Sequence, residues 1–208
     1  MTHLLILSRK AEAGNARAQC NLGWLYDQGQ GVRKSYKKAF YWYSKAATAG
    51  NRVAQYNLNL CYLEGRGVDA DEVQAFKWVQ RSANASYPDA ILALAWHYHN
   101  GCGTEENLKE AERWYRKSAR RREASAQFSL GQMCYDREDY AAARDWFEKA
   151  VLQRHPKAKY YLGRIYLEGR GVRRDVAKAA VLIREASSQH VGRATRLLRS
   201  KKFKRLTS

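Results

Sequence analysis

The stretch AQCNLGWLYDQGQGV at residues 18–32 returns as AQYNLNLCYLEGRGV at 54–68 and as AKYYLGRIYLEGRGV at 158–172. Periods of this size are typical of repeat proteins, in which each unit buries its apolar face only against its neighbours. The repeat therefore favours a binding protein over an enzyme. Its leading alanine recurs every 36 residues, with one gap of 32, at Ala18, Ala54, Ala90, Ala126, Ala158 and Ala194.

Each repeat is expected to open with an amphipathic helix that starts near this alanine. Apolar residues lie at the alanine and four and eight positions after it, and a small residue such as Gly23 or Gly163 lies at position five. That spacing predicts a buried helical face on which the small residue admits a close neighbour. Paired glycines then end the helix, because they accept positive φ angles. The fourth repeat lacks this loop, which accounts for the gap of 32 residues.

A second helix follows in each repeat. It begins after a residue that favours the N-cap position: Ser35, Asp71, Asn107, Asp139 and Asp175. A tryptophan column lies inside this helix and is expected to form the packed seam between helices, at Trp42, Trp78, Trp114 and Trp146, with Leu182 in the last repeat.

The chain ends fit the same frame. Residues 2–13 align with a lone second helix, and residues 188–203 align with a lone first helix, as expected for terminal caps. The sequence therefore predicts twelve helices and an all-α fold in a single domain, residues 1–208. Its five repeats are expected at about 14–49, 50–85, 86–121, 122–153 and 154–189.

The pattern A-x3-LG-x2-Y-x2-G-x-GV-x2-D-x3-A-x2-W-x3-AA-x2-G closely resembles the Sel1-like repeat, a relative of the tetratricopeptide repeat. The first repeat shows it at Ala18, Leu22, Gly23, Tyr26, Gly29, Gly31, Val32, Ala39, Trp42, Ala46, Ala47 and Gly50. The fourth repeat departs from it and looks more like a tetratricopeptide unit. The resemblance implies a right-handed α/α superhelical solenoid with half-repeat helical caps, which acts as an adaptor or scaffold for protein complexes.

Repeat proteins usually bind partners along a concave groove, which the first helices line. When the repeats are aligned with the tetratricopeptide repeat, many of the groove positions carry aromatic residues, which makes the groove more apolar than an ordinary solvent-exposed surface. Aromatic residues are typical anchors of protein interfaces. The alternative is that the next repeat buries several of them, above all Tyr56 and Tyr160. The predicted groove comprises Arg17, Trp24, Gln28, Tyr56, Leu60, Trp96, His99, Phe128, Gln132, Tyr160 and Arg164.

The formal net charge is +18, which predicts attraction to acidic partners. The expected partner is a protein or peptide of acidic character. Nucleic acid or another polyanion is the alternative, and a purely solvated basic face is the simplest explanation of the charge. Two basic clusters would bind the nucleic acid or other polyanion. The first comprises Arg113, Arg116, Lys117, Arg120, Arg121 and Arg122, and the second comprises Arg193, Arg196, Arg199, Lys201 and Lys202.

Catalytic and metal-binding signals are weak. His97, His99 and Cys102 are residue types that bind zinc, but residues two apart on a helix point to different sides. The sequence lacks a P-loop, a GxSxG and an HExxH motif. We therefore expect no enzyme activity, no catalytic residues, no metal and no cofactor.

Two further features of the sequence predict the cellular compartment of the protein. No apolar run approaches the ~20 residues that span a bilayer, and no secretory signal is convincing. The four cysteines occupy four different places in the repeat, so free thiols in a reducing compartment are expected. These features predict a cytoplasmic protein without a membrane span, while its oligomeric state stays open.

Overall fold

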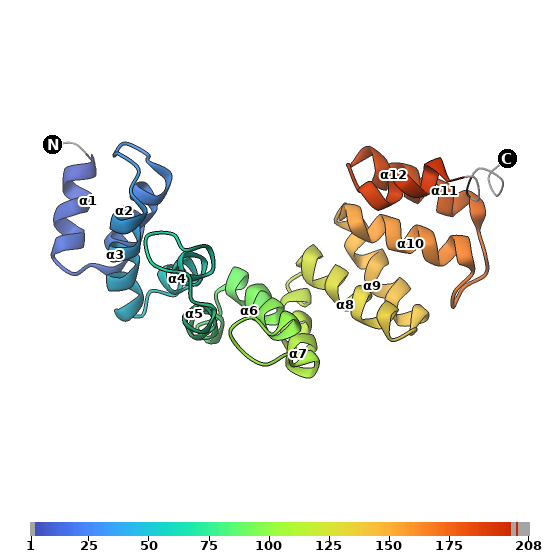
Figure 1. The fold of residues 1–208 in the computed structure, drawn as a ribbon, viewed down its shortest axis with the longest axis horizontal. Coiled ribbons are helices and arrows are strands. Elements are labelled where there is room, and N and C mark those ends of the chain that lie inside the picture. Colours follow the sequence, from blue (N-terminus) through green and yellow to red (C-terminus); the bar gives the residue numbers. More distant parts are fainter. Residues whose placement is uncertain (1–2, 201–202, 204–208) are drawn as a thin grey trace. The chain divides into compact units, whose positions relative to one another are not determined.

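The computed structural model describes residues 3–200 and residue 203. In this part of the chain all regular elements are helices, twelve in number, so the all-α prediction is confirmed (Figure 1). The chain divides into two compact units, unit 1 with residues 1–114 and unit 2 with residues 115–208. The single domain expected from the sequence stays a prediction.

Unit 1 alternates the two helix types of the repeat. Its lone second helix and the first three repeats are α1 (His3–Glu12), α2 (Ala16–Gln28), α3 (Tyr36–Thr48), α4 (Arg52–Glu64), α5 (Glu72–Asn84), α6 (Pro88–Asn100) and the start of α7 (Leu108–Ala119). Unit 2 continues with α8 (Ala124–Asp136), α9 (Tyr140–Leu152), α10 (Pro156–Glu168), α11 (Val176–Ser188) and α12 (Gly192–Arg199).

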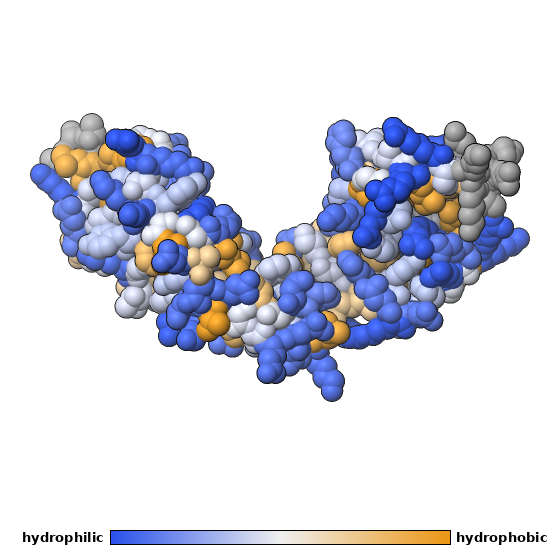
Figure 2. Space-filling view, viewed as in Figure 1, coloured by the Kyte–Doolittle hydropathy of each residue, from blue (hydrophilic) through white to orange (hydrophobic). Residues whose placement is uncertain are grey.

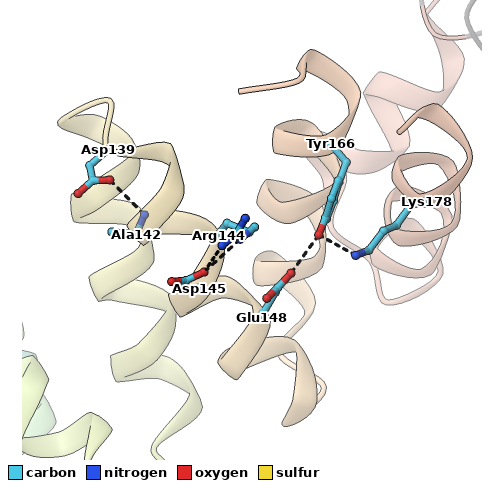
Figure 3. Close-up of polar contacts among 7 residues, drawn as sticks. All are labelled: Asp139, Ala142, Arg144, Asp145, Glu148, Tyr166 and Lys178. Carbon is cyan, nitrogen blue, oxygen red and sulfur yellow. Dashed lines mark hydrogen bonds and ion pairs between the residues drawn. The ribbon is translucent and has the colours of Figure 1, made fainter. Parts of the chain in front are cut away.

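The predicted N-caps are confirmed. The Ser35 hydroxyl accepts a hydrogen bond from the Lys38 backbone N–H at 3.3 Å, and Asp71 Oδ1 accepts one from Gln74 at 2.9 Å. Asp139 accepts the same bond from Ala142 at 3.1 Å (Figure 3). These side chains satisfy backbone donors that an α-helix leaves open in its first turn, which fixes where each second helix begins.

The loop glycines have the positive φ angles that the sequence predicted. Gly67 and Gly103 also meet a steric requirement. A Cβ on Gly67 would overlap the carbonyl of Tyr36, and a Cβ on Gly103 would overlap the carbonyl of Glu72. The loop of one repeat therefore packs directly onto the first turn of the second helix in the repeat before it.

The centre of the seam lies one residue after the tryptophan column. Trp114 is 9% exposed and belongs to the core. Trp42, Trp78 and Trp146 are half-buried, and cations lie near their rings, such as Arg81 at 4.7 Å from the Trp78 ring centre. The fully buried column is Tyr43, Val79, Tyr115, Phe147 and Ile183. The tryptophan column thus packs against the core, with Trp42 and Trp78 at its edge, while the more deeply buried column lies one residue later. The sequence did not separate the two columns, because positions three and four after the alanine of the second helix both satisfy the helical periodicity of an apolar face.

The small residue of the first helix faces this buried column, as predicted. A Cβ built on Gly23 would lie 2.7 Å from the Tyr43 ring, and one on Gly163 would lie 2.7 Å from Ile183. Close approach of the two helices of a repeat therefore depends on the small residue. In unit 2 the core continues through Phe147, whose ring stacks on Tyr161 with ring centres 5.4 Å apart.

Candidate binding surfaces

Three apolar side chains occupy the sixth position after the leading alanine in unit 1: Trp24 on α2, Leu60 on α4 and Trp96 on α6. Trp24 is 47% exposed and Trp96 is 45% exposed, whereas Leu60 is half-buried. Repetition of the helices places equivalent positions on the same side of successive repeats. We call these three residues the tryptophan surface.

The other predicted groove residues of unit 1 differ in how accessible they are. Arg17 and Gln28 are exposed, and the Gln28 amide donates a hydrogen bond to Asp27 at 2.8 Å. His99 is half-buried. Tyr56 is half-buried as well, with its ring centre 5.4 Å from that of Tyr87 in the turn that follows α5. The next repeat thus covers part of Tyr56.

A buried ion pair joins the first two repeats. Asp27 is 6% exposed, and the Arg66 guanidinium donates to its carboxylate at 3.1 Å. Arg66 also lies 3.0 Å from Glu64. Loss of Arg66 would leave the buried Asp27 carboxylate without its cation, so this pair holds the α4–α5 loop against α2.

In unit 2, three of the four predicted groove residues line a pocket of about 460 Å³ between α8, α10 and the α11–α12 turn. Phe128, Gln132 and Tyr160 line it. Arg164 lies outside this pocket, and its guanidinium donates to Glu168 at 2.9 Å. At the sixth position after the alanine, unit 2 therefore presents Gln132 and an ion-paired arginine in place of the apolar tryptophan surface.

The candidate zinc residues form a structural contact. His97 is fully buried, its Nδ1 lies 2.8 Å from the Cys102 carbonyl, and its Nε2 lies 2.8 Å from the Asn59 side-chain amide. Burial lowers the pKa of His97 and so favours the neutral ring. The atom of Asn59 that lies 2.8 Å from Nε2 is Oδ1. A neutral ring that donates from Nδ1 accepts at Nε2, so it pairs with Asn59 when the side-chain amide is turned to present its NH2 group there. Within the described residues no group of three or more His, Cys, Asp or Glu side chains could hold a metal ion.

The cysteines are free thiols, as predicted. Burial raises the pKa of Cys20 and of Cys61 to about 11, and it does the same for Cys102. These three thiols therefore stay protonated at neutral pH, which makes them poor nucleophiles.

A polar cluster in unit 2 ties three helices together (Figure 3). The Tyr166 hydroxyl on α10 donates to Glu148 on α9 at 3.0 Å and accepts from Lys178 on α11 at 2.7 Å. The Lys178 ammonium also lies 4.0 Å from the centre of the Tyr166 ring. In unit 1, Lys38 lies over the ring of Tyr26 at the equivalent positions, at 5.2 Å. Recurrence of this contact in two repeats indicates a structural role.

The basic residues are unevenly distributed between the units. Residues 115–208 hold 24 Lys and Arg against nine Asp and Glu, a formal charge of +15, whereas residues 1–114 hold 14 against 11, a charge of +3. Hydrophilic residues cover most of the face seen in Figure 2. Most of the net positive charge of the chain therefore lies in unit 2.

The predicted basic clusters are largely exposed. Arg113 pairs with Glu110 at 3.2 Å, and the Arg116 guanidinium lies 5.9 Å from the centre of the Trp146 ring. Lys201 and Lys202 lie outside the described residues. The exposed members are Arg113, Arg116, Arg120, Arg121, Arg122, Arg193, Arg196 and Arg199, and Lys117 is half-buried.

The Sel1 repeat pattern matches five consecutive segments, residues 16–51, 52–87, 88–122, 124–155 and 156–191. The chain belongs to the Sel1 repeat family. Members of this family generally mediate protein–protein interaction, and they are generally not enzymes.

Two solved structures support this membership. The chain is 34% identical to c5321, a protective antigen of uropathogenic Escherichia coli with an SLR fold, at a TM-score of 0.86. The match covers 91% of this chain and 41% of that antigen, so the chain spans less than half of its length. A Sel1 repeat protein from Oxalobacter formigenes is 32% identical at a TM-score of 0.78, over 88% of this chain and 76% of the other. No curated protein matches the chain.

The sequence alone did not single out Tyr161, Gln189 and His190, which line the pocket of unit 2. His190 has a φ of +61°, at the turn position where the first repeats carry Gly14 and Gly50. At this turn position the first two repeats carry glycine, so a histidine there stands out in the sequence as an unusual residue for a positive φ angle. Ser86, Arg122 and Arg154 also have positive φ angles there.

Among the described residues, none of the helices has the length and apolar character needed to cross a bilayer.

Proposed function

We propose that this chain is a non-enzymatic Sel1 repeat adaptor that binds a peptide or protein segment through the tryptophan surface of unit 1. Family membership supports the general role. The exposure of Trp24 and Trp96, at equivalent positions two repeats apart, supports this particular surface. Large aromatic side chains bury much apolar area at interfaces for a small loss of conformational entropy.

The arrangement suits an extended partner segment. One exposed indole from each of two repeats, with Leu60 at the repeat between them, offers a row of apolar contacts rather than a closed pocket. Binding along several repeats is the usual use of solenoid surfaces. Predicted groove residues with polar side chains, such as Arg17 and Gln28, would then orient the partner at the rim.

A capture experiment tests this proposal. Immobilised chain would be exposed to nuclease-treated lysate, and captured proteins would be quantified by mass spectrometry. We expect the double substitution Trp24→Ala/Trp96→Ala to reduce capture of specific partners at least about tenfold, as expected for loss of two anchors. The matched control is Tyr41→Ala/Val73→Ala, which removes two side chains that are each 50% exposed on α3 and α5. Equal loss in both double variants would contradict the proposal.

A second candidate function rests on the +15 formal charge of residues 115–208. Binding of nucleic acid or another polyanion would use Arg116, Lys117, Arg120, Arg121 and Arg122 together with Arg193, Arg196 and Arg199. Such binding releases counterions and therefore weakens steeply as salt rises. Tight, sequence-selective binding of RNA or DNA at physiological salt would favour this candidate over the adaptor.

A further inference from the structure

The pocket of unit 2 has the size of a ligand site. Its volume of about 460 Å³ falls within the range of roughly 300–1,000 Å³ that is typical of natural binding pockets. Phe128 from α8 and Tyr160 from α10 provide apolar walls. Tyr160 also borders a second cavity of about 530 Å³, lined by Arg164 and Leu197 among others.

Basic side chains line the pocket of unit 2. These are Lys157, Arg193 and His190, and none of the lining residues is acidic. Arg193 donates a hydrogen bond to the Tyr161 hydroxyl at 2.9 Å, which holds the guanidinium at the rim and leaves its other N–H groups for a ligand.

The first turn of α12 adds to the positive potential at this rim. The helix begins at Gly192, which also lines the pocket, and its N-cap Val191 makes no capping hydrogen bond through its side chain. The positive end of the helix dipole therefore reinforces the charge of Arg193 and Lys157.

The aromatic walls do not offer free ring faces. Phe128 stacks on His155 with ring centres 4.6 Å apart, and Tyr160 packs edge-on against Tyr161 at 5.3 Å. Tyr160 is only 9% exposed. Stacking of a nucleobase needs an accessible ring face, so these walls suit the edge of an apolar side chain better than a base.

Resting on the proposed function, we infer that this pocket binds an acidic segment of the protein partner, in which an aromatic or large aliphatic side chain is flanked by Asp or Glu. The apolar side chain packs between Phe128 and Tyr160. The flanking carboxylates accept charge-assisted hydrogen bonds from Arg193 and Lys157. The charge of unit 2 speeds encounter with such a segment.

The test uses a fluorescein-labelled, end-capped peptide of sequence Gly-Ser-Glu-Glu-Phe-Glu-Glu-Ser-Gly and the full chain at physiological salt. Fluorescence anisotropy would give its affinity. We expect Lys157→Gln/Arg193→Gln to weaken binding at least about fivefold, because two charge-assisted contacts are lost. Arg173→Gln/Arg184→Gln removes the same charge from exposed sites outside the pocket and should change the affinity less than about twofold.

Two peptide controls separate charge from apolar contact. Replacement of the four Glu by Gln, or of Phe by Ala, should each weaken binding at least about fivefold. The amide signals of Gly192 and Arg193 in NMR spectra should shift on titration with the parent peptide, and thermal melting should show that both double variants are folded.

The inference is overturned if the two double variants lose affinity equally, if either peptide control binds as well as the parent, or if the parent peptide does not bind. It is also overturned if oligo-dT binds more tightly than the peptide and depends on the same two residues. These results concern only the pocket of unit 2. If the capture experiment still shows a partner that depends on Trp24 and Trp96, the proposed adaptor function stands although the pocket inference has failed.

Discussion

Gly131 on α8 lies so close to Phe147 on α9 that a Cβ at this glycine would be 2.6 Å from the Phe147 ring. The substitution Gly131→Ala should therefore destabilise unit 2 by about 1–3 kcal/mol, the usual cost of an overpacked core. Urea denaturation followed by circular dichroism would measure the loss. Gly192 has open space around its Cβ position, so Gly192→Ala serves as the control and should not destabilise the chain.

A double-mutant cycle sharpens this prediction. Phe147→Leu reduces the ring to a smaller, flexible side chain, so Gly131→Ala should cost less in that background than in the native chain. Equal costs in the two backgrounds would show that the helices do not meet through this pair.

Tyr43 should contribute more to stability than its neighbour Trp42, although Trp42 is the residue of the repeat pattern. Tyr43 is 2% exposed, whereas Trp42 is half-buried. We expect Tyr43→Ala to destabilise unit 1 by roughly 3–5 kcal/mol and Trp42→Ala by about 1–2 kcal/mol. The ranking can be read from denaturation midpoints of the two variants, and the reverse order would place the tryptophan column at the centre of the seam.

The sequence was sufficient to predict the repeat, the helix order and the N-caps, because each depends on local residue types at fixed spacing. It was not sufficient to separate Tyr43 from Trp42 in the core, since both are large aromatic residues on one helical face. The sequence also left open whether the next repeat buries Tyr160, because that depends on contacts between repeats; Tyr160 is 9% exposed, whereas Trp24 is 47% exposed. The pocket of unit 2 depends on residues from three helices and a turn, which no single repeat contains.

His97 should make stability depend on pH. Burial places its pKa in the folded chain below the ordinary value of 6.5, so the unfolded chain binds the proton more readily. Its contribution to stability is complete above about pH 6.5 and is lost as the pH falls from there towards the folded-state pKa.

The measurement compares thermal midpoints of the native chain and His97→Gln between about pH 8 and about pH 5. The substitution removes the titrating group, so the stability advantage of the native chain should shrink as the pH falls. Burial also lowers the pKa of His155, and that contribution cancels because it is present in both proteins. An advantage that grows towards pH 5 would mean that His97 is charged in the folded state.

In the proposed function, unit 1 binds its partner by apolar contact at Trp24 and Trp96. Salt dependence of the affinity for the purified partner tests this contact, measured by calorimetry from about 50 to about 500 mM salt on the Lys157→Gln/Arg193→Gln variant, which lacks the charged contacts of the unit 2 pocket. Burial of apolar surface is not screened by ions, so we predict that affinity falls less than about tenfold over this range and that Trp24→Ala/Trp96→Ala removes most of it at every salt concentration. A fall of a thousandfold or more, with little effect of the double substitution, would contradict the account and indicate binding through the basic residues of unit 2.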